Sequence, residues 1–333
     1  KIFQYQLKTN ELRGCYMARF AKREYQLELV TPAFLGGADQ LAQWRTAGIK
    51  ALIRQWWRVV WTAENSTKSV DDMRIAEAVR FGSVQNGLNQ KAQIQIRFAE
   101  EPSNASGVVL GIRNDQNQSL QYLGFGPFVQ PTRPSSKAAL NSGAKVKFKV
   151  LVYSQNDTQT QQFSKEIDQT MFLVAQFGAL GSRSNNAWGS LHITGDIQPH
   201  DLKQYGQSIG QCLQSDWKKA ITKDDQGLMI WQTPPLNSTD DVMKRLKIFR
   251  KDGHNYIAKQ QGLRPLINAP VKGNQERNPS QYILKVLKDG TQYRGQITLL
   301  AHKWCNDNRD LLGLLTRISN ELDQNQSFKR IAG

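Results

Sequence analysis

Cationic and aromatic side chains recur at helical spacing between residues 45 and 61. Lys50, Arg54 and Arg58 follow one another at intervals of four, so they share one face of a helix, and Trp57 falls in the same sector. No acidic residue occurs in this stretch. Because cations neutralise phosphates and an exposed indole stacks on bases, this face is predicted to bind a nucleic acid.

The opposite side of the same predicted helix is apolar. Its residues follow the i, i+3, i+4, i+7 spacing of a core-facing stripe, and they are Ile49, Leu52, Ile53, Trp56 and Val60. One face is therefore expected to be buried and the other to meet a ligand. Arg45, at the start of the helix, adds another candidate phosphate contact.

Two glycine-rich segments offer backbone and hydroxyl donors. The first is a turn at Gly36 and Gly37, just before the helix. The second spans 178–191, and its candidate RNA-binding residues are Gly181, Ser182, Arg183, Ser184 and Trp188. Glycine permits close approach of the backbone to phosphate. No Gly-Lys-Ser/Thr follows, so the second segment is not a P-loop, and a plain connector between a helix and a strand is the alternative.

Asp39 is a candidate catalytic residue. A carboxylate on a flexible loop beside a basic helix can assist RNA cleavage, by orienting a 2′-hydroxyl or by holding a metal ion. The sequence places no second acid or histidine with it. We therefore favour a role for Asp39 in fixing the turn, and we keep an endoribonuclease as the alternative.

Other motifs carry little chemistry. The GQSIG of residues 206–210 matches the G-x-S-x-G of hydrolases, but it falls inside a pattern that predicts an amphipathic helix over 202–217. His302 and Cys305 have H-x-x-C spacing without a second pair of ligands. We predict no metal site, no cofactor and no catalytic serine.

Composition favours a polyanionic partner. The 333 residues contain 44 Lys and Arg against 28 Asp and Glu, a net charge of +16. Three cysteines without a CxxC fit a reducing cytosol. No apolar run approaches the ~20 residues of a membrane span, and the N-terminal segment is too polar for a secretory signal. We expect a cytoplasmic protein with no membrane partner.

The predicted elements mix strands and helices. Strands are expected at 24–30, 92–98 and 145–153, a hairpin at 282–301, and helices at 45–61, 70–81, 161–177, 202–217, 240–252 and 307–322. Both halves follow a β-α-β-β-α-β-like order, with a boundary near Gly195. This order predicts an α+β fold.

Several motifs together resemble a known family. They are TPAFLGGADQ at 31–40, IKALIRQWWR at 49–58, EAVRFGS at 77–83, LGSRSNNAWGSL at 180–191 and RNPSQYILKVL at 277–287. The ordered set is similar to the first subunit of the CRISPR Cmr effector complex, in the RAMP superfamily. A related RAMP subunit of another type III complex remains an alternative.

The resemblance implies two packed ferredoxin-like (RRM-like) domains with insertions, here 1–195 and 196–333. It implies a non-catalytic subunit that caps the filament near the 3′ end of the guide RNA and helps to hold target RNA. Its partners would be guide CRISPR RNA, target RNA and other RAMP subunits, and it would not be an obligate homo-oligomer. A protein–protein role for the aromatic and basic helix is a weaker alternative.

The resemblance also assigns residues. The family's basic helix corresponds to Lys50, Arg54, Trp57 and Arg58, and its first glycine-rich turn to residues 36–39. In filament-forming RAMP subunits an aspartate near this turn cuts target RNA, which is the basis of the alternative role for Asp39.

Overall fold

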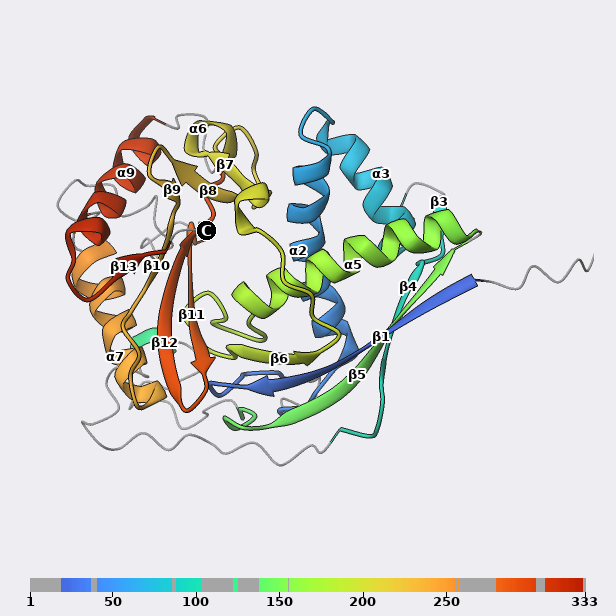
Figure 1. The fold of residues 1–333 in the computed structure, drawn as a ribbon, viewed down its shortest axis with the longest axis horizontal. Coiled ribbons are helices and arrows are strands. Elements are labelled where there is room, and N and C mark those ends of the chain that lie inside the picture. Colours follow the sequence, from blue (N-terminus) through green and yellow to red (C-terminus); the bar gives the residue numbers. More distant parts are fainter. Residues whose placement is uncertain are drawn as a thin grey trace, which may run out of the picture.

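The structure is a computed structural model that describes residues 19–36, 41–85, 88–102, 122–124, 138–154, 156–254, 257, 280–303 and 309–331 (Figure 1). Gly37 and Asp39 lie outside these ranges. None of the helices in the described ranges is both long and apolar enough to cross a membrane.

The first sheet contains β1 (Arg19–Leu29), β4 (Ile94–Phe98), β5 (Lys145–Ser154) and β6 (Leu191–Gly195), in the order β4-β5-β1-β6. Every neighbouring pair is antiparallel. Helix α2 (Thr46–Glu64) follows β1, and α5 (Asp157–Phe177) follows β5. This is the β-α-β-β-α-β order of a ferredoxin-like domain, and we call it the first repeat.

A second sheet repeats the same plan. It contains β10 (Ile230–Gln232), β11 (Tyr282–Asp289), β12 (Gln292–Leu299) and β13 (Lys329–Arg330), in the order β11-β12-β10-β13. Helix α7 (Thr239–Ile248) follows β10, and α9 (Arg309–Gln324) follows β12. A π-helical turn, η3 (Phe249–His254), extends α7. The predicted α+β fold with two ferredoxin-like units is confirmed.

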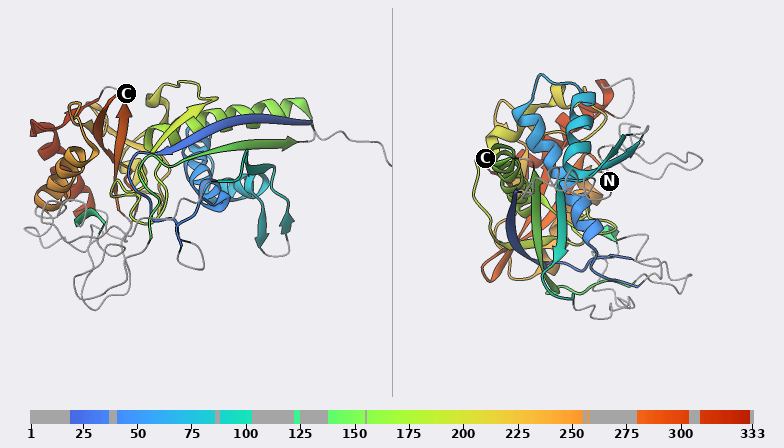
Figure 2. Two further views of the ribbon diagram at one scale, coloured as in Figure 1. Left: turned by 90° about the horizontal axis from the view of Figure 1, so that it is seen from below. Right: turned by 90° about the vertical axis from the view of Figure 1, so that its right-hand side faces the viewer.

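Smaller elements decorate the two repeats. After α2 come α3 (Val70–Phe81) and a hairpin of β2 (Ser83–Gln85) and β3 (Leu88–Gln90), which projects from the body in Figure 2. Between the repeats lie η2 (Leu202–Tyr205), β7 (Gly206–Ser208), α6 (Ile209–Cys212), β8 (Ile221–Asp224) and β9 (Gly227–Leu228).

The prediction of one continuous helix over 202–217 is wrong. The segment is divided among η2, β7 and α6, and β7 pairs in parallel with β8. Tyr205 packs into the core that contains β1 and α2, whereas Cys212 and Leu213 pack into the core that contains β11 and α9. The apolar spacing therefore reflects burial in two different cores and not one helical stripe. Ser208, the serine of the G-x-S-x-G motif, caps α6 together with Gln211.

The two hydrophobic cores interlock. Ile230, Ile283 and Leu300 of the second repeat pack into the first core, and Val30 and Phe34 pack into the second. β6 ends at Gly195, where the sequence predicts the boundary. Because each core contains residues from both sides of Gly195, independent domains at 1–195 and 196–333 remain a prediction.

Candidate nucleic-acid interface

The structure brings the two glycine-rich segments together. The turn after β1 and the loop between α5 and β6 are joined by backbone hydrogen bonds. The amide of Ser182 donates to the carbonyl of Phe34 (3.1 Å), and the amide of Gly189 donates to the carbonyl of Pro32 (2.9 Å). The hydroxyl of Thr31 donates to the carbonyl of Ala187 (2.6 Å). Segments far apart in the sequence thus form one wall of a site.

The backbone of this loop requires glycine at defined points. Gly181 and Gly189 have φ angles of 91° and 65°, and a Cβ at Gly189 would lie 1.9 Å from the carbonyl oxygen of Leu180. Arg183 and Ala187 also have positive φ, of 65° and 68°. Non-glycine residues rarely adopt this conformation, and such backbone is concentrated at functional sites.

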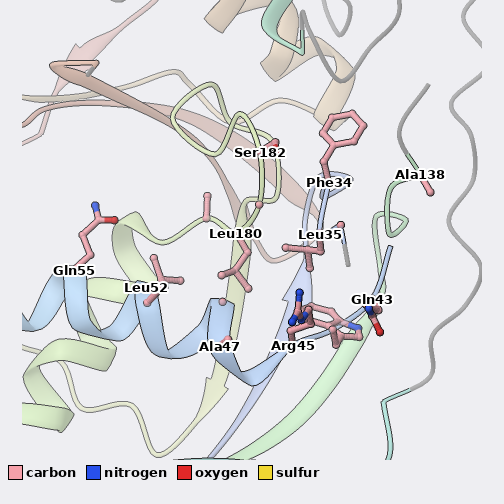
Figure 3. Close-up of a pocket in the computed structure, with 16 residues that line it drawn as sticks. Phe34, Leu35, Gln43, Arg45, Ala47, Leu52, Gln55, Ala138, Leu180 and Ser182 are labelled. Atoms are coloured by element: carbon pink, nitrogen blue, oxygen red, sulfur yellow. The ribbon is translucent and has the colours of Figure 1, made fainter. Parts of the chain in front are cut away.

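A first cavity of about 570 Å³ lies between this wall and α2. Figure 3 shows Ala47, Leu52 and Gln55 of α2 facing the loop that carries Leu180 and Ser182. Of the predicted RNA-binding residues, those that line this cavity are Gly36, Arg45, Gly181 and Ser182. Predicted RNA-binding residues from three separate segments of the sequence thus line one cavity.

The start of α2 gives this cavity a positive potential. The N-cap residue, Arg45, makes no side-chain cap hydrogen bond, and the first turn of α2 contains no acidic residue. The positive end of the helix dipole therefore favours an anion at this point, and Arg45 adds a full charge. The indole nitrogen of Trp44, which also lines the cavity, has no hydrogen-bond partner among the residues that the structure describes.

A second cavity, of about 640 Å³, adjoins the first. Both are lined by Ala51 and Gln55, so together they form a groove along α2, which we call the α2 groove. The second cavity is further lined by Arg54, Arg58, Ser184, Asn185, Asp216, Trp217, Lys218 and His302. The guanidinium of Arg58 lies 5.5 Å from the centroid of the Trp217 ring.

Arg54 and Arg58 are not the free cations that the helical spacing predicts. Both pair with Glu77 of α3, whose side chain is only 5% exposed, and Nε of Arg54 lies 2.6 Å from its Oε1. Burial alone would raise the pKa of Glu77, but hydrogen bonds from Arg58 and Arg54 outweigh it and lower that pKa. The two arginine side chains remain 45% and 32% exposed, and they share a single negative charge.

Trp57 and Trp188 do not face solvent, so the expectation that they stack on bases is wrong. Trp57 is fully buried, and its indole donates to Glu166 of α5 (2.8 Å). The ring of Phe81 packs edge-on against it at 5.4 Å. Trp188 is also fully buried and contacts Phe34, with ring centroids 4.8 Å apart. Both indoles are part of the core because α3, α5 and the turn after β1 cover them.

Lys50 lies apart from the α2 groove. Its ammonium donates to the carbonyl of Phe81 at the end of α3 (2.9 Å). It lines a separate surface depression together with Lys91 and Arg97 beside β4. Burial, and then the nearby charge of Arg54, lower the pKa of Lys50. The fourfold spacing therefore does not place Lys50, Arg54 and Arg58 on one ligand-binding face.

One cation of the site, Lys218, is absent from the residues predicted from the sequence. Lys218 lines the second cavity, and burial together with the charge of Arg250 lowers its pKa to about 8. Arg250 is buried, forms no ion pair with a described residue, and has an Nη1 without a hydrogen-bond partner. Burial, followed by the charge of Arg183, lowers the pKa of Arg250 to about 10.

His302 also lines the second cavity. Burial is the main reason that its pKa falls to about 4, and its Nδ1 lies 3.0 Å from the carbonyl oxygen of Leu300. The imidazole is therefore neutral at pH 7. Only the Lys218–Lys219 pair, directly after Trp217, is a local signal in the sequence for this part of the site.

The described residues include no group of three or more His, Cys, Asp or Glu that could hold a metal ion. Asp39 and Gly37 lie outside the described residues, so the catalytic alternative is neither supported nor contradicted.

The fold can be compared with solved structures. No family model and no curated protein matches the chain. Cmr1 from Pyrococcus furiosus, solved in its apo form, is 13% identical over 86% of this chain and 90% of its own, with a TM-score of 0.51. A chain of the type III-B Cmr-beta complex bound to cognate target RNA is 11% identical over 90% and 99%, with a TM-score of 0.49. The chain described here therefore has the fold of Cmr1, the subunit that its sequence motifs resemble.

Proposed function

We propose that this protein is a non-catalytic, RNA-binding RAMP subunit of a type III CRISPR ribonucleoprotein, and that RNA lies in the α2 groove. The observation that carries the proposal is the union of the glycine-rich turn, the glycine-rich loop and the basic side of α2 around two adjoining cavities. The likeness of the fold to Cmr1 supports the choice of complex.

The charge of the groove suits a phosphate backbone. Among the described residues, its four full cations are Arg45, Arg54, Arg58 and Lys218. They face two carboxylates, Asp216 in the lining and Glu77 behind the arginines. The backbone amides at the start of α2 and the hydroxyls of Ser182 and Ser184 add donors without adding negative charge.

The partners that follow are guide CRISPR RNA, target RNA and the neighbouring RAMP subunits. A place at the end of the filament, near the 3′ end of the guide, is part of the proposal and comes from the family resemblance. The net charge of +16 supports RNA as the principal partner, because an excess of cations attracts a polyanion.

The test is binding of a short fluorescein-labelled oligouridylate to the full chain, measured by anisotropy over a range of salt concentrations. Arg45→Gln combined with Lys218→Gln should weaken binding about tenfold or more, and the slope of log K against log salt should fall by ~0.7 for each phosphate that is no longer neutralised. These two residues are better targets than Arg54 and Arg58, whose removal would leave Glu77 buried without a partner.

Arg74→Gln is the matched control, because Arg74 is an exposed cation on α3 that does not line the groove. An affinity and a salt slope equal to those of the wild type in the Arg45 and Lys218 double variant would refute the assignment of the groove.

The variant Asp39→Ala distinguishes the proposed non-catalytic role from the endoribonuclease alternative. If the assembled complex still cuts labelled target RNA at every site, Asp39 is not a catalyst. Loss of one cut site while RNA binding persists would favour the nuclease and contradict a non-catalytic subunit.

A further inference from the structure

The first sheet has an outer face that its own helices leave uncovered. Along β1, Tyr25 and Leu27 are buried in the first core, and along β5 so are Phe148 and Val150. Figure 1 shows α2 and α5 on one side of these strands. Because successive strand residues point to opposite faces, the intervening residues of β1 and β5 point away from the helices.

Two aromatic rings lie side by side on this outer face. Phe20 of β1 is directly opposite Tyr153 of β5, and the ring centroids are 6.2 Å apart with planes inclined at 35°. Phe20 is 62% exposed, although it is a large apolar side chain. The hydroxyl of Tyr153 lies 3.4 Å from Oε1 of Gln95 on β4, which in turn accepts a hydrogen bond from Arg97 (3.0 Å). The pair thus has an aromatic surface beside polar groups.

Cations follow the outer face from the two rings toward the other end of β1 and β5. Among the described residues, the cations on or beside this face are Lys22, Arg97, Lys145, Lys147, Lys149 and Lys288, and the acids are Glu24, Glu28, Glu100 and Asp196. Many of the ion pairs are exposed and long, such as Lys147 with Glu100 at 3.6 Å. Exposed pairs of this kind contribute little free energy, so phosphates can replace the carboxylates.

We propose that this face is a second binding surface, which takes a short single-stranded segment of RNA. One base stacks on Phe20 and a neighbouring base packs against Tyr153. Lys22 neutralises the phosphate nearest the rings, and Lys149 and Lys147, farther along β5, neutralise the phosphates that follow. Aromatic rings on central strands of a four-stranded sheet are a recurrent platform for unpaired bases.

The occupant follows from charge and from the size of the apolar surface. The face carries six cations for four acids, which leaves an excess of positive charge that suits a polyanion. Among the described residues, its apolar centre consists of the two rings and Leu151, which is small for the hydrophobic core of a stable protein interface. This surface is distinct from the α2 groove, because α2 lies against the other side of the sheet.

The test uses the full chain and a fluorescein-labelled oligouridylate. Phe20→Leu combined with Tyr153→Leu keeps apolar side chains on the strands but removes the stacking surfaces. We expect binding to weaken about tenfold or more, with the slope of log K against log salt unchanged, because every cation is retained. The groove variants lower that slope, so failure of one proposal is distinguishable from failure of the other. Ile75→Ala, at an apolar residue of α3 that is 67% exposed, is the control.

A second measurement locates the contact directly. Photo-crosslinking with an oligonucleotide that contains 5-iodouridine should attach to the peptides carrying Phe20 and Tyr153. Wild-type affinity in the double leucine variant, or crosslinks confined to the α2 groove, would overturn the proposal. A variant that binds RNA normally but loses a neighbouring subunit would show that the face is a protein interface, and would equally overturn it.

Discussion

At the scale of single residues, the sequence pattern does not predict the contacts of Glu77. It lies between Arg54 and Arg58 on a different helix, and it converts two apparent phosphate contacts into a shared ion pair. Removing either partner of a buried ion pair lowers the free energy of unfolding, because the remaining charge is left without its counter-ion. Glu77 therefore fixes α3 to α2 and orients the arginines that line the second cavity.

Glu77→Gln should lower the free energy of unfolding by about 2–3 kcal/mol at pH 7, since a buried pair is broken but the arginines can reach water. Urea denaturation gives this difference. Asp71→Asn is the matched control, because Asp71 is an exposed acid on the same helix, paired with Arg74, and its loss should cost less than about 1 kcal/mol.

The pH dependence of this effect has a defined sign. The pKa of Glu77 is lower in the folded protein than its usual value of 4.5. Its stabilisation is therefore complete above pH 4.5 and is lost as the pH falls through the folded pKa. The difference in unfolding free energy between wild type and Glu77→Gln should shrink below pH 4.5. A difference that does not change with pH would show that the carboxylate charge is not responsible.

At the scale of elements, the glycine-rich loop between α5 and β6 connects the two repeats. One side bonds to the turn after β1, and the other side bonds to β11, where the amide of Leu284 donates to the carbonyl of Asn185 (3.0 Å) and the amide of Val286 donates to the hydroxyl of Ser190 (3.0 Å). The loop therefore holds the two repeats together and shapes the first cavity at the same time.

The variant Gly189→Ala tests whether the loop holds the two repeats together. A methyl group there would meet the carbonyl of Leu180 in a backbone conformation that alanine rarely adopts, so we expect a loss of roughly 2–4 kcal/mol in the free energy of unfolding. RNA affinity should fall as the groove loses its wall. Gly210→Ala in α6 is the control, because a Cβ there meets no atom within 4 Å. Equal stabilities of the two variants would contradict the role of the loop.

At the scale of the whole molecule, the second repeat is fixed to the C-terminal end of α5. Nζ of Lys285 on β11 donates to the carbonyl of Ala175 (2.5 Å), and the side-chain amide of Gln296 on β12 donates to the carbonyl of Gln176 (3.0 Å). The last carbonyls of a helix have no partner within the helix, so a lysine at this position supplies the donor that the carbonyl of Ala175 needs. Lys285 nevertheless has no carboxylate partner among the described residues, and burial lowers its pKa to about 7.

Lys285→Met should change how stability depends on pH. Between about pH 7 and pH 10 the unfolded chain binds a proton that the folded lysine releases, so the wild type gains stability as the pH rises and the variant lacks that gain. Urea denaturation at several pH values across this range would measure the free energy of unfolding of each protein. Lys91→Met, at an exposed lysine, should follow the wild type, and parallel curves for all three proteins would contradict a buried neutral lysine at the junction of the repeats.

Local sequence is sufficient for many elements. Helix α3 begins and ends where the sequence predicts, because Ser69 and Asp72 form a capping box and Asp71 and Asp72 stabilise its first turn. The hairpin of β11 and β12 follows from a turn at Gly290, whose φ is 61°. These features depend on neighbours within a few residues, so the sequence alone determines them.

Tertiary structure decided which faces are buried. Helical spacing correctly placed Arg54, Trp57 and Arg58 close together on α2, but Glu77 from α3 and Glu166 from α5 determine what those side chains meet. Lys218 joins the groove from a segment far along the chain. Periodicity reports which residues share a face, whereas contact with distant elements determines whether that face meets water, a carboxylate or a ligand.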